Sequence, residues 1–157
     1  MSRTFTASIS FSLPAGPANA RTLMILTNPA TKILELTSAF VSAANVDASE
    51  QIELAIQEVN VLGAPTGTVV TPAPHAMGGA AALVTAIGNV TASEPSYVAD
   101  TQVGLAGASS VTGYRWEPVD EDEQIELEPS GSLGLRLLAD KDTACILTVR
   151  LTFREKP

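Results

Sequence analysis

Residues 113–155 read GYRWEPVDEDEQIELEPSGSLGLRLLADKDTACILTVRLTFRE, and the alternation inside this stretch decides the fold of the chain. Its final run alternates apolar with mostly polar residues, and the apolar positions are Cys145, Leu147, Val149, Leu151 and Phe153. Side chains in a β-strand point alternately to opposite faces, so the run predicts a strand with one face against a core. An earlier run alternates in the same way at Leu133, Leu135 and Leu137. Because turn-like residues 139–142 separate the two runs, we predict an antiparallel hairpin.

The chain begins with the same kind of alternation at residues 4–13, and Pro14 ends it because proline cannot donate to a sheet ladder. This first strand could either join the sheet or reach a neighbouring subunit as an arm. A helix competes with a strand in three later segments, where β-branched residues or neighbouring strands favour a strand. The three ambiguous segments are 31–43, 51–60 and 80–91. The other predicted short strands are 22–27, 66–71, 96–105 and 111–117.

The number and spacing of these segments predict an all-β fold with at most one short helix. We expect a jelly-roll-like antiparallel β-sandwich of about 8–10 short strands, with an N-terminal strand or arm. The length of 157 residues fits a single globular domain. Within it, residues 1–30 are expected to form the N-terminal strand or arm and a connector, and residues 31–157 the jelly-roll domain.

The charge of the chain argues against two classes of partner. Nine Lys and Arg residues against seventeen Asp and Glu give a formal net charge of -8, which repels nucleic acid and anionic membrane surfaces. No apolar run approaches the roughly 20 residues of a membrane-spanning helix, and no signal-peptide pattern is visible. We therefore expect a soluble protein made in the cytoplasm. The single cysteine, Cys145, is expected to be a buried small hydrophobic residue.

The sequence contains no recognisable catalytic constellation, so we predict that the protein is not an enzyme and needs no cofactor. His75 is the one histidine, which excludes a multi-histidine zinc site within one chain, and Ser109 and Ser110 have no base nearby in the sequence. Asp120 and Asp122, in the acidic run 119–123, are weak candidates for calcium ligands. The run lacks the spacing of a helix-loop-helix calcium site, which favours a solvated acidic loop. A calcium ion shared between subunits remains the alternative.

Four residues are candidates for contacts between subunits. Phe5, Ile9 and Phe11 lie on the apolar side of the first strand, which would present them to a neighbour if that strand were an arm. Trp116 is interpreted as a packing anchor or an interface residue, since tryptophan is enriched at subunit contacts.

Several short motifs follow one another along the chain: Gly88-Asn89-Val90-Thr91, Glu94-Pro95, residues 113–118, residues 125–129, residues 131–137 and a closing strand that ends Thr152-Phe153-Arg154-Glu155. In this order, they resemble a family of small phage structural proteins with a jelly-roll fold similar to that of tumour necrosis factor. The similarity covers roughly residues 31–155 and matches no part of residues 1–30.

This resemblance implies a non-enzymatic virion protein that decorates and cements the outer capsid surface as a homotrimer bound to the major capsid protein. The alternative that it implies is a tail or head-fibre binding module that recognises a host surface glycan or protein. Such a module would bind through the loops, especially residues 63–79 and 106–123. The resemblance transfers no individual binding residue to this chain.

Overall fold

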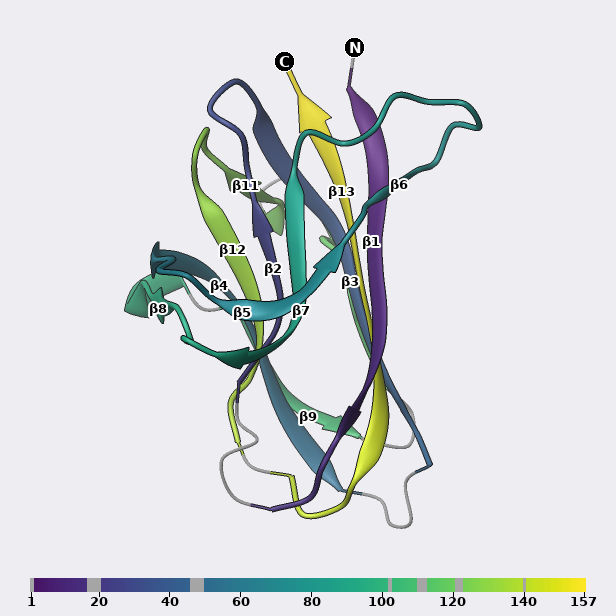
Figure 1. Ribbon diagram of the computed structural model, residues 1–157, viewed down its shortest axis with the longest axis vertical. Helices are drawn as coiled ribbons and strands as arrows, with labels where there is room; N and C mark the ends of the chain where they lie inside the picture. The colour runs from purple at the N-terminus through teal and green to yellow at the C-terminus, as the bar shows by residue number, and fades with distance from the viewer. Residues whose placement is uncertain are drawn as a thin grey trace.

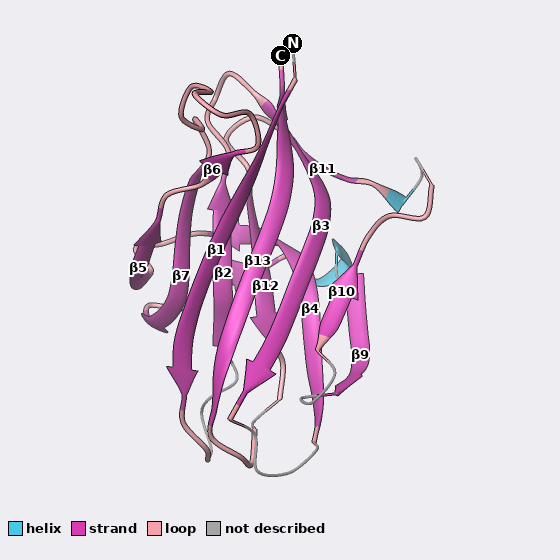
Figure 2. Cartoon of the chain, turned by 90° about the vertical axis from the view of Figure 1, so that its right-hand side faces the viewer, coloured by secondary structure: helices cyan, strands magenta, loops and turns pink. Residues whose placement is uncertain are grey.

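The protein is an antiparallel β-sandwich whose two sheets face each other across one apolar core (Figures 1 and 2). A computed structural model describes residues 2–16, 21–45, 50–101, 103–109, 113–120, 123–139 and 141–157. The described part is built from strands and one short 3-10 helix, η1 (Ala99–Thr101). The all-β prediction is therefore confirmed.

Thirteen strands are present in the described residues, and several of them have only two or three residues. They are β1 (Arg3–Leu13), β2 (Arg21–Thr27), β3 (Ile33–Ala44), β4 (Gln51–Val61), β5 (Thr66–Val70), β6 (Ala73–Pro74), β7 (Thr85–Ala92), β8 (Ser96–Tyr97), β9 (Val103–Ser109), β10 (Tyr114–Trp116), β11 (Ile125–Leu127), β12 (Ser132–Leu137) and β13 (Cys145–Lys156). The first sheet has the order β10-β3-β13-β1-β6, and β11 also pairs with β3. The second sheet has the order β5-β7-β2-β12-β4-β8, and β9 also pairs with β4.

The eight principal strands pair in a nested order. The first pairs with the last (β1 with β13), and the next pairs inward are β2 with β12, β3 with β10 and β4 with β9. Successive pairs alternate between the two sheets, so the chain is a long antiparallel ribbon rolled into a sandwich. This arrangement is jelly-roll-like, as the sequence predicts. Both ends of the described chain lie side by side at one end of the sandwich (Figure 1).

The hairpin predicted from residues 133–137 and 145–153 is wrong. Strand β12 lies in the second sheet between β2 and β4, whereas β13 lies in the first sheet between β1 and β3. The connection crosses between sheets that pack about 10 Å apart. It is held to the start of β4, where the backbone N–H of Leu138 donates to the carbonyl oxygen of Glu53 at 2.8 Å. Alternation identified the buried side of each strand but not the neighbour with which it pairs.

Residues 4–13 join a sheet of their own chain. Of the two alternatives, a strand of the sheet and an arm that reaches a neighbouring subunit, the structure shows the strand. All eleven residues of β1 pair with β13, from Arg3 opposite Glu155 to Leu13 opposite Cys145. Strand β2 lies in the middle of the second sheet, so residues 1–30 contribute one strand to each sheet.

The other strand predictions are confirmed with changed boundaries. β2, β3, β4 and β5 match the predicted segments, and β5 is an edge strand. In the segment 80–91 only β7 is extended, and the segment 96–105 is divided into β8, η1 and the start of β9.

The core is built mainly from Leu, Ile, Val and Ala, with the inward side chains of both sheets interleaved. Its aromatic centre is the cross-strand pair Phe5 and Phe153, which are fully buried with ring centroids 5.8 Å apart. A contact of this kind stabilises a fold by about 0.5–1.5 kcal/mol beyond the burial of the ring surface. The closing strand and the opening strand are thereby fixed to each other at the middle of the first sheet.

Candidate functional site

The outer face of the first sheet is covered largely by small hydroxyl side chains. The alternating polar residues of β1 and β13 point away from the core and lie opposite one another. On the other side of β13, Thr148 and Thr152 lie opposite Ser42 and Ser38 of β3. Hydroxyl groups join neighbouring strands, with 2.7 Å between Ser10 Oγ and Thr148 Oγ1 and 3.1 Å between Thr6 Oγ1 and Thr152 Oγ1. We call this surface the hydroxyl face, and its hydroxyl residues are Thr4, Thr6, Ser8, Ser10, Ser12, Ser38, Ser42, Thr148 and Thr152.

A shallow hollow interrupts the hydroxyl face between β13, β3 and β10. Its central row runs across the sheet from Arg150 through Phe40 to Arg115, which are cross-strand neighbours. The hollow has a volume of about 270 Å³, and we call it the arginine hollow. Its lining residues are Ser38, Phe40, Arg115, Arg150 and Thr152.

The two arginines of the hollow differ in their partners. Arg115 forms an ion pair of 2.5 Å with Glu117, and both side chains are largely exposed. Arg150 is exposed and forms no ion pair with any residue that the structure describes. The guanidinium group of Arg150 therefore keeps its full set of donors directed to solvent or to a partner.

Further along the same face, two cations meet one buried carboxylate. Glu35 accepts Lys156 Nζ at 2.6 Å and Arg154 at 3.3 Å, and its side chain is almost fully buried. Glu126 also pairs with Lys156, and this hydrogen bond is the main reason that the pKa of the lysine is raised. Four of the nine Lys and Arg residues in the chain thus lie on the outer face of the first sheet: Arg115, Arg150, Arg154 and Lys156.

Two of the four predicted interface residues lie inside the core of their own chain. Phe5 is 0% exposed and Phe11 is 9% exposed, because β1 is a strand of the sheet and its apolar side faces the second sheet. Ile9 and Trp116 are partly buried and pack against the same core. Their contact with another subunit stays a prediction.

Two carboxylates of the acidic loop, those of Asp120 and Glu123, accept hydrogen bonds from the backbone of the loop. Asp120 Oδ1 accepts the backbone N–H of Glu123 at 3.2 Å, and Glu123 Oε2 accepts that of Val119 at 3.0 Å. Asp122, the other weak calcium candidate, lies outside the described residues. No group of three or more potential His, Cys, Asp or Glu ligands occurs in the part of the chain that the structure describes. Calcium binding at Asp120 and Asp122 stays a prediction.

The remaining predicted residues have structural surroundings. His75 Nε2 lies 2.7 Å from Thr6 Oγ1 at the edge of the first sheet. The backbone of Ser109 ends β9, its side chain is not described, and Ser110 lies outside the described residues. Neither serine can therefore be assigned a base.

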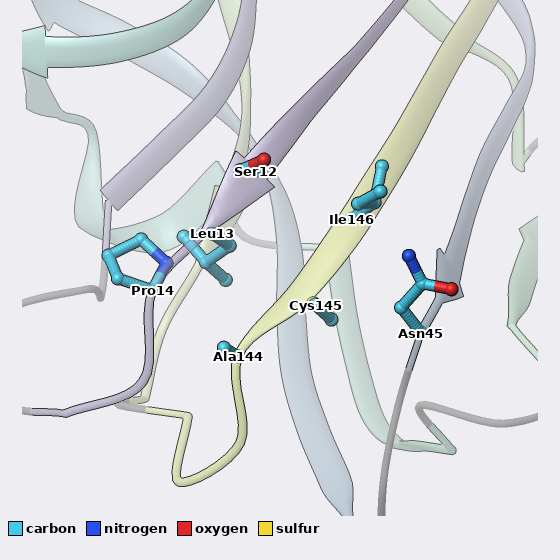
Figure 3. A pocket seen from close by; sticks show the side chains of 7 residues that line it. All are labelled: Ser12, Leu13, Pro14, Asn45, Ala144, Cys145 and Ile146. Carbon is cyan, nitrogen blue, oxygen red and sulfur yellow. The ribbon is translucent and has the colours of Figure 1, made fainter.

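A pocket of about 320 Å³ lies where β1 ends and β13 begins (Figure 3). Its lining includes Cys145, which is 5% exposed, as the sequence predicts for a buried small hydrophobic residue. Burial is the main cause that raises the pKa of the Cys145 thiol. Since the thiolate is the reactive form, this cysteine is poorly suited to nucleophilic chemistry.

A polar cluster on the outer side of the second sheet was not visible in the sequence. Thr22 Oγ1 donates to Glu94 Oε2 at 2.5 Å and lies 2.5 Å from the hydroxyl of Tyr97. The guanidinium of Arg136 stacks 4.1 Å from the centre of the Tyr97 ring. Tyr97 reaches this position because Gly134 has no side chain, and a Cβ there would lie 2.4 Å from the tyrosine oxygen. The cluster fixes the segment of β8 to the sheet.

Alkaline pH is expected to destabilise the protein through Tyr97. The pKa of Tyr97 is raised to about 12 in the folded state, mainly because the side chain is buried, whereas the pKa of an unfolded tyrosine is about 10. The contribution of neutral Tyr97 to the stability of the folded protein is complete below the unfolded pKa, and it is lost as the pH rises through the folded pKa. Thermal unfolding measured from pH 9 to pH 12 should show a falling melting temperature. In the Tyr97→Phe variant this fall should be smaller, and an equal fall in both proteins would contradict the assignment.

No family model, curated protein or solved structure matches this chain. Its function therefore has to be argued from its own residues. Among the described residues, no helix is long and apolar enough to cross a membrane.

Proposed function

We propose that this chain is a non-enzymatic structural protein of a virion, which assembles as a homotrimer and decorates and cements the outer surface of a capsid through the major capsid protein. The observation that carries the proposal is the hydroxyl face. Its small side chains allow another protein surface to approach closely, and their hydroxyl groups can donate to and accept from a partner. A surface with few long side chains also loses little side-chain entropy when it is covered.

The carboxylates of Glu155, which is buried, and of Glu94, which is exposed, support a structural role. Glu155 accepts the backbone N–H groups of Leu83 and Val84 at 2.6 and 2.8 Å, and so fixes the end of a long loop to β13. Glu94 accepts the backbone N–H of Thr22 in the polar cluster. Groups with such roles hold the fold together and have little freedom to transfer protons to a substrate.

The jelly-roll-like pairing gives the proposal its architectural support. Double-sheet jelly rolls occur in viral capsid proteins and also in lectins and cupins, so the fold alone does not select a function. Closed symmetric assembly would cover the hydroxyl face and protect exposed sheet edges from unwanted pairing. The resemblance of the sequence motifs to phage structural proteins points to the same choice.

The native mass in solution is the first test. Light scattering of the purified protein should give three times the chain mass of 16.3 kDa. A monomer at all concentrations would contradict the homotrimer. Gold-labelled antibodies on phage particles that carry the protein should then decorate the head. Labelling confined to the tail would contradict capsid decoration and favour a tail binding module.

A further inference from the structure

We propose that the arginine hollow of one copy holds a carboxylate from the acidic loop of the next copy, at Asp120 or Glu123. The inference rests on the proposed homotrimer and identifies the contact that would hold it together. The partner is thus a second copy of this chain, and the charge complementarity of two surfaces of the same molecule is the argument for it.

The arginine hollow is a site that favours an anion. Arg150 and Arg115 flank Phe40 on opposite sides, and two strand spacings place their backbones about 10 Å apart. A carboxylate in the hollow could accept a two-pronged hydrogen bond from Arg150, while Arg115 on the other side of Phe40 is paired with Glu117. Ser38 and Thr152 line the same hollow with hydroxyl groups that can donate to the second carboxylate oxygen.

The hollow stands out against the charge of the chain as a whole. The net charge is -8, yet the outer face of the first sheet carries the cations named above. Three of the other basic residues are engaged elsewhere: Arg21 donates to Asn89, Arg136 to Gln57 and Lys141 to Glu50. Among the cations of this face, Arg115, Arg154 and Lys156 are paired with carboxylates, and Arg150 has no ion pair with a described residue. Arg150 can therefore attract an acidic surface, and every other copy offers one.

The acidic loop is placed where a neighbour could receive it. Its described residues follow β10 and precede β11, the two short strands that pair with β3 at the edge of the first sheet (Figure 2). Asp120 and Glu123 are exposed there, next to Val119, which is 87% exposed. An exposed valine next to Asp120 adds apolar area to the same contact.

A contact between the face of one copy and the edge loop of the next joins two different surfaces. Such a heterologous contact leaves a free face and a free loop at the ends of any chain of subunits, so it is completed only when the ring closes. A trimer is one such closed ring, whereas a two-fold dimer pairs the same patch with itself. The geometry of the two surfaces therefore agrees with the proposed homotrimer.

Charge reversal tests the contact. The Arg150→Glu variant should dissociate the trimer, with at least roughly tenfold weaker association, because it places two negative groups together. Adding Asp120→Lys and Glu123→Lys to the same chain should restore association, since the charges are then reversed on both sides. Arg3→Glu is the matched control, because Arg3 is exposed and lies outside the hollow. Light scattering over a concentration series measures the association of each variant, and thermal melting followed by circular dichroism shows whether each variant is folded.

The outcomes separate the inference from the proposed function. A trimer that Arg150→Glu leaves as stable as Arg3→Glu would overturn the inference while leaving the homotrimer in place, and so would a failure of the compensating changes to restore association. A wild-type monomer would contradict the homotrimer itself. The last experiment measures the binding of glucuronate, a free acidic sugar, to the protein. Saturable binding to wild-type trimer that Arg150→Glu abolishes would show that the hollow is open to small ligands and would also overturn the inference.

Discussion

Deletion of residues 2–13 is expected to abolish folding, in contrast to the loss of attachment alone that an arm would produce. The deletion removes a strand that pairs with β13 along its whole length. It also takes Phe5 and Phe11 from the core and leaves the edge of β13 unpaired. Circular dichroism and proteolysis should report an unfolded or aggregated chain. A cooperative melt from the shortened protein would show that the first strand is dispensable to the sandwich.

A point substitution tests the same conclusion in a protein that still folds. Phe5→Ala should cost about 3–5 kcal/mol in the free energy of unfolding, because it leaves a cavity beside Phe153. Ser8→Ala, on the outward side of the same strand, is the matched control and should change stability by less than about 0.5 kcal/mol. Urea unfolding measures both values. Equal effects of the two substitutions would mean that β1 does not present its apolar side to the core.

The strands of this fold could be predicted from the sequence where one face of the strand is buried and the other is exposed to solvent. The alternation in residues 4–13 and 145–153 gives β1 and β13 with the correct inward side. β3 and β4 were ambiguous because their residues also suit a helix. β-branched residues favoured a strand for β3 and neighbouring strands favoured one for β4, and both segments are strands in the structure.

The pairing of β12 could not be predicted, because both of its faces are covered. Leu133 and Leu135 face the core, and Gly134 between them lies under Tyr97. A strand that is covered on both faces lies in the middle of a sheet, yet the short polar connection to β13 suggested a simple hairpin. The covering segment is 37 residues earlier in the chain, counted from Tyr97 to Gly134, and no local pattern indicates it.

Only part of the candidate site could be predicted from the sequence. The polar positions of residues 4–13 identify the outward side of the first strand, which is part of the hydroxyl face. The meeting of Arg150 with Arg115 depends on β3 pairing with both β13 and β10, which is a long-range property. The interface candidates Phe5 and Phe11 failed for the converse reason, since apolar residues of a strand that joins the sheet are used by the core.

The connection between β12 and β13 depends on an ion pair, and its loss is the second large effect that we expect. Lys141 is 1% exposed, and its Nζ lies 2.9 Å from Glu50 Oε2. Glu50 also accepts the backbone N–H groups of Asp142 and Thr143 at 2.7 and 3.2 Å. One carboxylate therefore holds the crossing between the two sheets. Glu50→Gln removes the negative charge of this ion pair from beside a buried cation, and it should cost about 3–5 kcal/mol in the free energy of unfolding.

Two further variants test whether the loss depends on the position of the carboxylate and on the unbalanced charge of Lys141. Glu53→Gln removes an exposed carboxylate from β4, which begins directly after Glu50, and it should change stability by less than about 0.5 kcal/mol. The double variant Glu50→Leu with Lys141→Met should be more stable than Glu50→Gln, because well-packed apolar side chains need no counter-charge. Guanidinium unfolding of the four proteins gives the comparison. A loss below about 1 kcal/mol in Glu50→Gln would show that Lys141 finds enough other partners.

The pH dependence of the same variant follows from the carboxylate. Burial alone would raise the pKa of Glu50, but the hydrogen bonds from Lys141, Asp142 and Thr143 outweigh it and lower the pKa below its usual value. A lowered folded pKa gives stability that is complete above the unfolded pKa of about 4.3 and is lost as the pH falls through the folded value. The wild-type protein should therefore lose stability below about pH 4. In Glu50→Gln this part of the acid dependence should be absent, so the stability difference between the two proteins should narrow as the pH falls.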